Sequence, residues 1–468
     1  MKAEVLTIGD ELLRGEIVDS NKSFLSQRLL TLDIETRFHA SVLDDRADMA
    51  DAFRRAAARS DIVLVSGGLG PTRDDLTIEV LAETFGRKLV LDEASLEEIR
   101  SFFRRFGREM AEINAKQALF PEGAEVLPNP IGTAPGTMLE VARAELEARP
   151  AQRAEGERSQ QQGKTLFFCM PGVPRELYKM MDEQVLPRIA ARRRATSFAR
   201  AALLRTFGIG ESNLDERLRD LELPLGVELG FRTNFPDNYV RPVARAASEA
   251  EAQAKLERAC AAIRAQLGPL VYGEGEAETL EAVVGRMLAE RGQSVAAGES
   301  CTGGMIAELL TAVPGSSGYF RGGVVAYSNA AKTALLGVPA ALLEQHGAVS
   351  EPVARAMAEG VRERFAVDYA VATTGIAGPS GGTPEKPVGL VYVALASATA
   401  TEVRELVFTF DRERNRRVTA QVALDWVRRQ LLGEPLDLPT ASAGKAGARS
   451  EAKPREGQQA GRVEGKRP

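Results

Sequence analysis

Residues 298–304 read Gly-Glu-Ser-Cys-Thr-Gly-Gly and separate an apolar run from an amphipathic segment at residues 305–313. This order predicts a strand, a tight turn and the start of a helix. The first N–H groups of a helix have no partner within it and favour an anion, so Ser300 is a candidate nucleophile whose neighbouring amides hold developing negative charge. The alternative on this stretch alone is that Ser300 or Thr302 caps the helix.

Composition limits the classes of protein and the compartment. At roughly 150 residues per domain, a chain of 468 residues predicts roughly three domains, and 44% apolar residues are enough for real cores. The net charge of −5 gives no basic field, so we expect no nucleic-acid partner. Three cysteines without CxxC spacing indicate a reducing compartment. The start, MKAEVLTIGDELL, does not resemble a signal peptide, and no apolar run reaches the roughly 18 residues of a membrane span, so we expect a cytoplasmic protein with no membrane partner.

Strand and helix patterns alternate over residues 3–85 and again over residues 278–432, which predicts sheets covered by helices on both faces, with a parallel sheet in the first region. The expected fold class is α/β: two three-layer α/β/α domains joined by a small α+β module. The predicted boundaries are 1–174 for the first domain, 175–275 for the linking module and 276–433 for the last domain. Two segments are expected to carry no site: a polar surface insertion at 142–164 and a disordered tail at 434–468.

Two polar clusters follow strands in the first domain, where ligands of such sheets bind. One is GDELLRG at residues 9–15 with Asp19 and Asn21, and the other is SGGLGPTRDDLT at residues 66–77. The glycines of the second cluster allow a backbone to approach a phosphate, and Asp74 and Asp75 are suited to a divalent metal. The alternative is a glycine turn followed by acidic residues that complement a helix N-terminus.

A serine nucleophile needs a base, and the chain has two histidines, His39 and His346, of which His346 lies in the same domain as Ser300. The other available base is a lysine whose pKa burial has lowered. Tyr327 and Lys332 follow the next predicted strand and are expected to face Ser300 across a shared cleft. Lys332 is the better candidate, and its alternative is an ordinary exposed helix lysine.

Two further groups are expected at the same edge of this sheet. Thr374 and Gly375 follow a buried strand and could bind a substrate or donate to an oxyanion. Arg412 and Arg416 open the final helix, where the helix dipole opposes basic residues unless an anion binds there. A phosphate subsite is one explanation, and a solvated basic face is the other.

Several long motifs occur together in one order. In the first half they are GDELLRGEIVDSN, SGGLGPTRDDLT, NPIGTAPG and PGVP, and in the second half GESCTGG, GGVVAYSNAAK, HGAVSEP, TTGIAGPSGGTPEKPVG and DRERNRR. Together they resemble the two-part CinA proteins, the competence/damage-inducible family, over most of residues 1–432. The resemblance implies a C-terminal nicotinamide-nucleotide amidohydrolase, which converts nicotinamide mononucleotide to nicotinic acid mononucleotide and ammonia without a cofactor. It also implies a molybdopterin-binding-like N-terminal domain associated with metal-dependent ADP-ribose pyrophosphatase activity, and a homodimer.

The resemblance also implies roles for particular residues. The implied catalytic residues are Ser300, Lys332, Tyr327 and Thr374, and the implied C-terminal substrate contacts are Thr302, Gly303, Gly304, Gly375, Arg412 and Arg416. The implied N-terminal substrate contacts are Gly67, Gly68, Gly70, Asn21 and Thr77, and the implied metal ligands are Asp10, Glu11, Asp19, Asp74 and Asp75. Two alternatives stay open, since fold alone does not choose a substrate: molybdopterin binding by the first domain, and an adaptor role in DNA uptake or repair.

Overall fold

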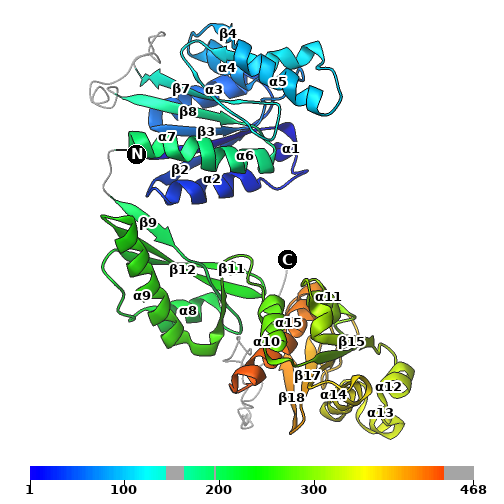
Figure 1. Ribbon diagram of the computed structural model, residues 1–468. Helices are drawn as coiled ribbons and strands as arrows, with labels where there is room; N and C mark the ends of the chain where they lie inside the picture. The colour runs from blue at the N-terminus through cyan, green and yellow to red at the C-terminus, as the bar shows by residue number, and fades with distance from the viewer. Residues whose placement is uncertain (144–162, 194–196, 437–468) are drawn as a thin grey trace, which may run out of the picture. The chain divides into compact units, whose positions relative to one another are not determined.

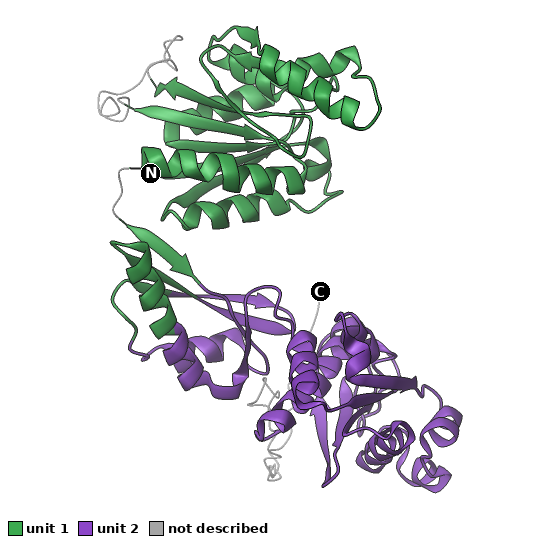
Figure 2. Cartoon of the chain, in the orientation of Figure 1, with its two compact units in different colours: residues 1–201, 223–228, 242–259 green, residues 202–222, 229–241, 260–468 purple. Residues whose placement is uncertain are grey.

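The computed structural model describes residues 1–143, 163–193 and 197–436. These residues form two compact units (Figure 2). The first comprises residues 1–201, 223–228 and 242–259, and the second residues 202–222, 229–241 and 260–468. Most of the predicted insertion and of the predicted tail lie outside the described residues. Within the described residues, no helix is both long enough and apolar enough to cross a membrane.

The first unit is built on a six-stranded sheet in the order β2-β1-β3-β8-β7-β6. Its strands are β1 (Lys2–Ile8), β2 (Glu35–Val42), β3 (Ile62–Ser66), β6 (Glu125–Leu127), β7 (Gly136–Ala142) and β8 (Lys164–Met170). The first four strands of this order are parallel, as predicted, whereas β7 and β6 are antiparallel. The sheet is mixed because β7 pairs antiparallel with both β8 and β6.

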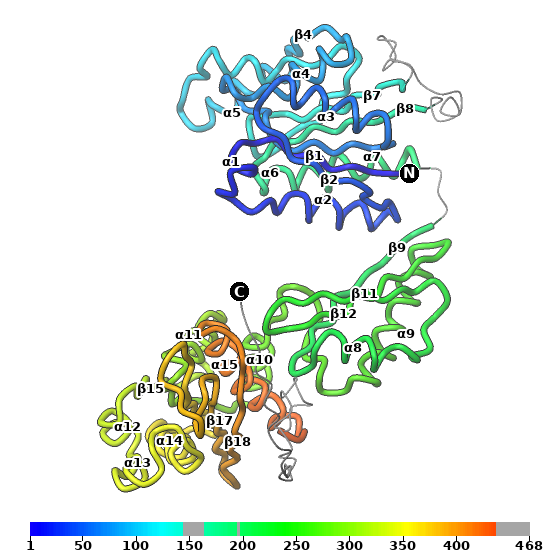
Figure 3. Tube along the Cα trace, turned by 180° about the vertical axis from the view of Figure 1, so that it is seen from behind, coloured from blue at the N-terminus to red at the C-terminus, as the bar shows by residue number. Residues whose placement is uncertain are grey.

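Alternate residues of these strands point to opposite faces, and helices cover both. Val5 and Leu64 belong to a core shared with α2 (Ser20–Leu30), α6 (Pro174–Met180) and α7 (Leu186–Arg192). Leu6 and Val65 belong to a second core, shared with α3 (Arg46–Arg59) and α4 (Thr77–Thr84). Figures 1 and 3 show these two helical layers on either side of the sheet. The remaining elements are α1 (Asp10–Leu13), β4 (Leu89–Leu91), α5 (Glu93–Arg105), a 3-10 helix (Glu112–Ala118), β5 (Leu119–Pro121) and a π-helix (Met181–Val185).

The predicted boundary at residue 174 falls too early. Leu177, Met180 and Ile189 are fully buried in the same core as the first sheet, so α6 and α7 belong to the first unit. The sequence at residues 201–207 is typical of a single strand, but the structure has two short strands there, β9 (Phe198–Ala201) and β10 (Leu204–Thr206).

The remaining elements of the middle module are α8 (Glu211–Leu218), β11 (Val227–Asn234), β12 (Asp237–Ala246), α9 (Glu249–Leu267), a 3-10 helix (Gly268–Leu270) and β13 (Val271–Glu274). The division into units passes through β11, β12 and α9. In the first unit, β9 pairs with residues 243–246 of β12. In the second, β10 pairs with residues 238–240 of β12 and with β13.

The second unit carries a five-stranded sheet in the order β15-β14-β16-β17-β18. Its strands are β14 (Val295–Glu299), β15 (Phe320–Val325), β16 (Tyr369–Gly375), β17 (Leu390–Ala396) and β18 (Thr401–Val407). Its helices are α10 (Leu280–Arg291), α11 (Met305–Thr311), a 3-10 helix (Ser316–Gly318), α12 (Asn329–Leu336), α13 (Ala340–His346), α14 (Glu351–Phe365) and α15 (Arg412–Leu432). The strands β15, β14 and β16 are parallel, so their carboxyl ends meet at one edge.

Helices cover both faces of this sheet as well. Val295 and Val371 pack with α10, α11 and α15, whereas Ala296 and Ala372 pack with α12, α13 and α14 (Figure 1). The small alanine side chains on the second face allow α14 to lie close to the sheet. The predicted α/β class, with two sheets covered by helices on both faces, is confirmed.

Candidate functional sites

Ser300 lies directly after β14, at the edge where the three parallel strands end. Its N–H donates to the carbonyl of Thr373 in β16 at 2.9 Å, which ties the turn to the neighbouring strand. The side chain is 8% exposed, so its hydroxyl lies in a largely water-excluded position. The adjacent Cys301 does not compete as a nucleophile, because burial raises the pKa of its thiol to about 12.

Lys332, near the start of α12, contacts the Ser300 hydroxyl. The distance from Lys332 Nζ to Ser300 Oγ is 2.9 Å, and the same amine donates to the carbonyl of Ala326 at 3.0 Å. Lys332 is 1% exposed, and burial lowers its pKa because the ammonium form is poorly solvated there. Lys332 is therefore not an exposed helix lysine. Of the two candidate bases, His346 and Lys332, only Lys332 forms a hydrogen bond with Ser300 within the described residues.

The turn after Ser300 has neither of the two features expected from the sequence, an open anion site and a helix cap by Ser300 or Thr302. The N–H groups of Gly304, Ile306 and Ala307 donate to the Glu299 carboxylate at 2.9, 3.1 and 2.9 Å. Neither Ser300 nor Thr302 caps α11, so the helix-cap alternative is wrong. The anion expected at this helix N-terminus is part of the protein itself, because the Glu299 carboxylate at the end of β14 accepts from these N–H groups.

Most of the predicted substrate contacts of this turn have structural partners. The Thr302 hydroxyl is fully buried and lies 2.7 Å from that of Thr373. The Thr302 carbonyl accepts from Arg416 at 2.8 Å, and the Arg416 guanidinium lies beside Gly303. Gly303 and Gly304 adopt positive φ angles of 62° and 95°, which the sharp turn requires. Arg416 therefore stabilises the Ser300 turn from α15.

The other predicted groups lie around the same strand ends. Tyr327 is 60% exposed, and its hydroxyl accepts from Arg412 at 3.0 Å. Arg412 also donates to the carbonyl of Gly378 at 2.7 Å. The Thr374 hydroxyl donates to the carbonyl of Ala348 at 2.7 Å, so its proton is not free for an oxyanion in this structure. Gly375 pairs with β17, where a Cβ would lie 2.6 Å from the carbonyl of Leu390.

The first unit has a cavity of about 480 Å³ at the carboxyl ends of its strands. The glycine loop that follows β3 lines it, together with Glu11, Asp44, Asp74, Asp75 and Glu176. Burial raises the pKa of Asp44, and the carboxylates of Asp10, Glu11 and Asp75 raise it further. The cavity thus has a glycine main chain that a ligand can approach closely, and several carboxylates whose negative charges lie near one another.

The five predicted metal ligands do not come together. Glu11, Asp74 and Asp75 line the cavity, but Asp10 exchanges hydrogen bonds with Asp44, and Asp19 caps α2 and pairs with Lys22. Asp75 accepts from the N–H and hydroxyl of Thr72. Across residues 1–143, 163–193 and 197–436, no three acidic, histidine or cysteine side chains gather closely enough to hold a metal ion.

Thr77 and Asn21, two predicted substrate contacts, form hydrogen bonds with the glycine loop or the segments beside it. The Thr77 hydroxyl is buried and donates to the carbonyl of Gly67 at 2.8 Å. The amide of Asn21 donates to the carbonyl of Gly172 at 2.8 Å and to Ser66 at 3.0 Å. Gly70 itself lines the cavity, where a Cβ would lie 2.5 Å from an oxygen of Asp75.

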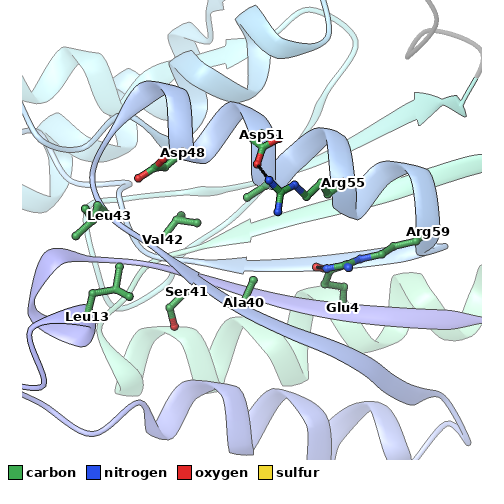
Figure 4. A pocket seen from close by; sticks show the side chains of 11 residues that line it. Glu4, Leu13, Ala40, Ser41, Val42, Leu43, Asp48, Asp51, Arg55 and Arg59 are labelled. Carbon is green, nitrogen blue, oxygen red and sulfur yellow. Dashed lines mark hydrogen bonds and ion pairs between the residues drawn. The ribbon is translucent and has the colours of Figure 1, made fainter. Parts of the chain in front are cut away.

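A second hollow of about 490 Å³ lies between α3 and the edge strand β2 (Figure 4). Its basic side chains are already paired, Arg59 with Glu4 and Arg55 with Asp51. None of the predicted site residues lines it. The glycine-lined cavity is therefore the candidate site of the first unit.

Sequence reasoning missed several residues of both sites. Asp44 could have been found, because it follows the second strand just as Asp10 follows the first. Gln117 and Glu176 enter the first cavity from later segments, and no local pattern marks them. Glu299 stands inside the motif around Ser300, but its contacts with α11 depend on how the turn folds back.

Fold and site together define an α/β protein with a buried serine–lysine pair in one unit and a glycine-lined, acidic cavity in the other. Three family models match the chain: the CinA C-terminal domain at residues 277–431, a probable molybdopterin binding domain at 4–191 and the damage-inducible protein CinA KH domain at 202–273. The chain belongs to the CinA family.

Relatives match almost the whole length of the chain. A CinA-like protein of Anaeromyxobacter sp. strain Fw109-5 is 46% identical over 92% of this chain and 98% of its own. A putative competence-damage inducible protein of Symbiobacterium thermophilum is 44% identical, again over 92% of this chain and 99% of its own. Among solved structures, the competence/damage inducible protein CihA of Agrobacterium tumefaciens is 38% identical over 33% of this chain and 97% of its own, with a TM-score of 0.32.

Proposed function

We propose that the C-terminal unit hydrolyses the amide of nicotinamide mononucleotide to nicotinic acid mononucleotide and ammonia. The observation that carries the proposal is the 2.9 Å contact between Ser300 Oγ and the buried amine of Lys332. A lysine whose pKa burial has lowered has a larger free-amine fraction near neutral pH, and a free amine can accept the serine proton.

In the proposed reaction, Ser300 Oγ attacks the amide carbonyl carbon while Lys332 Nζ takes the hydroxyl proton. The C–N bond breaks as the Lys332 ammonium returns that proton to the leaving nitrogen, which departs as ammonia and leaves an ester on Ser300. Water then adds to the ester carbon with Lys332 as base, and Ser300 leaves with its proton restored. The sum is one amide and one water converted to one carboxylic acid and one ammonia.

The charge around the site supports a phosphorylated substrate. Arg412 and Arg416 lie in the first two turns of α15, and neither forms an ion pair with a carboxylate within the described chain. A bound phosphate would supply the missing negative charge. Tyr327 is exposed beside them and offers an aromatic surface at the same edge.

Replacement of Ser300 by alanine tests the proposal. Purified wild type is expected to release ammonia from nicotinamide mononucleotide, and Ser300→Ala to lose at least about 10³-fold in kcat, because it removes the nucleophile. Ser317→Ala, an exposed serine in the same unit, is the control and should keep the wild-type rate. An active Ser300→Ala variant, or an inactive wild type that is fully folded, would overturn the proposal.

A second function is proposed for the first unit, hydrolysis of the pyrophosphate of ADP-ribose. The observation in its favour is the cavity of about 480 Å³, in which the glycine loop that follows β3 meets Asp74 and Asp75. The requirement for a divalent metal stays a prediction. Asp74 and Glu11 are the lining carboxylates best able to ligate an ion, because neither side chain forms a hydrogen bond or ion pair within the described residues.

Two alternative functions, molybdopterin binding and an adaptor role, differ in the observations that support or oppose them. Molybdopterin binding draws support from the matching domain model at residues 4–191 and would use the same cavity. An adaptor role in DNA uptake or repair draws support only from the names of relatives, and the net charge of −5 opposes direct contact with DNA. The homodimer stays a prediction.

A further inference from the structure

Glu299 is a buried carboxylate that the proposed reaction does not use. It is 1% exposed, and within the described residues no cation pairs with it. Its partners are the N–H groups of Gly304, Ile306 and Ala307. An ionised carboxylate is costly to bury, and three N–H donors at a helix N-terminus are a strong compensation for that cost.

The Glu299 hydrogen bonds connect the chain just before the nucleophile Ser300 with the helix that follows it. Glu299 precedes Ser300 directly, and its side chain reaches forward across the turn to the first N–H groups of α11. Gly304, the residue before α11, has no side chain with which to cap the helix, and its φ of 95° requires a glycine. The carboxylate therefore takes the place of a helix cap and joins the end of β14 to α11 on either side of Ser300.

The main chain of Glu299 also contributes to the position of the base. Its carbonyl accepts from the N–H of Ala326 at 2.8 Å, and the carbonyl of Ala326 accepts from Lys332 Nζ at 3.0 Å. Residue 299 is thus bonded on one side to the helix that follows the nucleophile and on the other to the segment that holds the lysine.

We infer that Glu299 is a positioning residue for Ser300, whose carboxylate holds the turn at residues 300–304 so that Ser300 Oγ meets Lys332 Nζ. The inference rests on the proposed serine–lysine reaction. Four ties fix this turn: Ser300 N–H to β16, the Thr302 hydroxyl to Thr373, the Thr302 carbonyl to Arg416, and Glu299 to α11. The Glu299 tie is the one formed by a residue adjacent to the nucleophile.

Glu299→Gln tests the inference with nearly unchanged shape. The amide retains one acceptor oxygen and turns a donor toward an N–H group that needs an acceptor, so the turn should shift. Because a misplacement of about 1 Å can cost about 10²-fold, kcat for ammonia release should fall about a hundredfold. KM should stay within about threefold, since the proposed phosphate contacts come from α15.

The matched control is Glu308→Gln, an exposed glutamate in α11, the helix whose first N–H groups donate to Glu299, and it should keep the wild-type kcat. Glu299→Asp keeps the charge but shortens the side chain by one methylene, so its kcat should lie between those of Glu299→Gln and wild type. This variant also serves if Glu299→Gln does not fold. A folded Glu299→Gln or Glu299→Asp with the wild-type kcat would overturn the inference.

A second readout separates this inference from the choice of substrate. A fluorophosphonate probe reacts with a poised serine whatever amide the protein hydrolyses. Wild type should be labelled at Ser300, Glu308→Gln at the same rate and Glu299→Gln at least about tenfold more slowly, a change of about 1.4 kcal/mol in activation free energy. Slower labelling with no ammonia released from nicotinamide mononucleotide would refute the substrate and support the positioning role. Equal labelling of wild type and Glu299→Gln, or no labelling of wild-type Ser300, would refute the positioning role.

Discussion

Among the residues that the structure describes, two lysines form a hydrogen bond with a serine, and their surroundings distinguish them. Lys22 lies against Ser41, but its amine also forms an ion pair with the Asp19 carboxylate at 3.2 Å. Lys332 lies against Ser300 without an ion pair in the described chain, and burial lowers its pKa. A lysine–serine contact alone therefore does not define a base. What distinguishes Lys332 is a buried amine with no carboxylate beside it.

The lowered pKa of Lys332 predicts how activity depends on pH. The rate of ammonia release should rise with pH and level off below the ordinary lysine value of 10.5, because the free amine is the active form and burial shifts its titration downward. Lys332→Met should lose about 10²–10⁴-fold in kcat at every pH, the usual contribution of a general base. Steady-state assays from pH 6 to 10 measure both effects.

Lys22→Met is the control for this series and should leave both the rate and its pH profile unchanged. A wild-type rate that does not vary with pH would contradict the role of Lys332 as a base, as would a Lys332→Met variant that keeps more than about a tenth of the activity.

Among the helices and strands, those with a long repeated apolar pattern could be predicted from the sequence, and the very short ones could not. The sequence of residues 249–267 and 351–365 predicts a helix over each range, because each has an apolar face over several turns, and the structure has α9 and α14 with these bounds. Strands β4, β5 and β6 have three residues each, too few to show a period. Strand β7 was missed because it stands between a turn-rich loop and the polar insertion.

The candidate sites followed the same physical rule. Ser300, Lys332 and Thr374 could be grouped from the sequence, because each lies near or after the carboxyl end of one of three neighbouring strands with patterns of their own. The role of Glu299 could not be predicted, since it requires two left-handed glycines that turn the chain back onto a strand-end carboxylate. The dispersal of Asp10 and Asp19 was equally hidden, because both are bound by side chains and backbone outside their motif.

The glycine loop that follows β3 allows a prediction with an internal control. Gly68 has a φ of 66°, and a Cβ there would lie 2.2 Å from the Thr77 hydroxyl oxygen. Gly86 has nearly the same φ, 64°, but nothing lies within 4 Å of its Cβ position. Each change to alanine costs about 1–2 kcal/mol for the left-handed backbone, and Gly68→Ala adds a clash with the buried hydroxyl that Gly86→Ala lacks.

Gly68→Ala is therefore expected to destabilise the full chain by at least about 1 kcal/mol more than Gly86→Ala. Urea unfolding followed by far-ultraviolet circular dichroism compares the two variants. Equal urea midpoints for the two variants would show that the loop accommodates the added methyl group without cost. The loop would then not form the fixed backbone cradle proposed for a phosphate.

For the whole molecule, the two candidate sites draw their residues from separate units. The glycine-lined cavity uses residues 8–176, all in the first unit, whereas Ser300, Lys332 and Arg416 belong to the second. Sites that share no residues and no bonded partners respond to substitution independently. This arrangement predicts that each proposed activity can be removed by itself.

Asp74→Asn and Ser300→Ala are the pair of variants that tests this independence. Asp74→Asn should reduce hydrolysis of ADP-ribose about a hundredfold, the usual effect of removing one group that stabilises a transition state, and should leave ammonia release within about twofold of wild type. Ser300→Ala should do the reverse, and the double variant should lose both activities while unfolding at the wild-type temperature. Since Asp74 has no side-chain partner in the described residues, its replacement should not disturb the fold. If Asp74→Asn alone abolished both activities in a folded protein, the two reactions would depend on one composite site, and the assignment of one activity to each unit would fail.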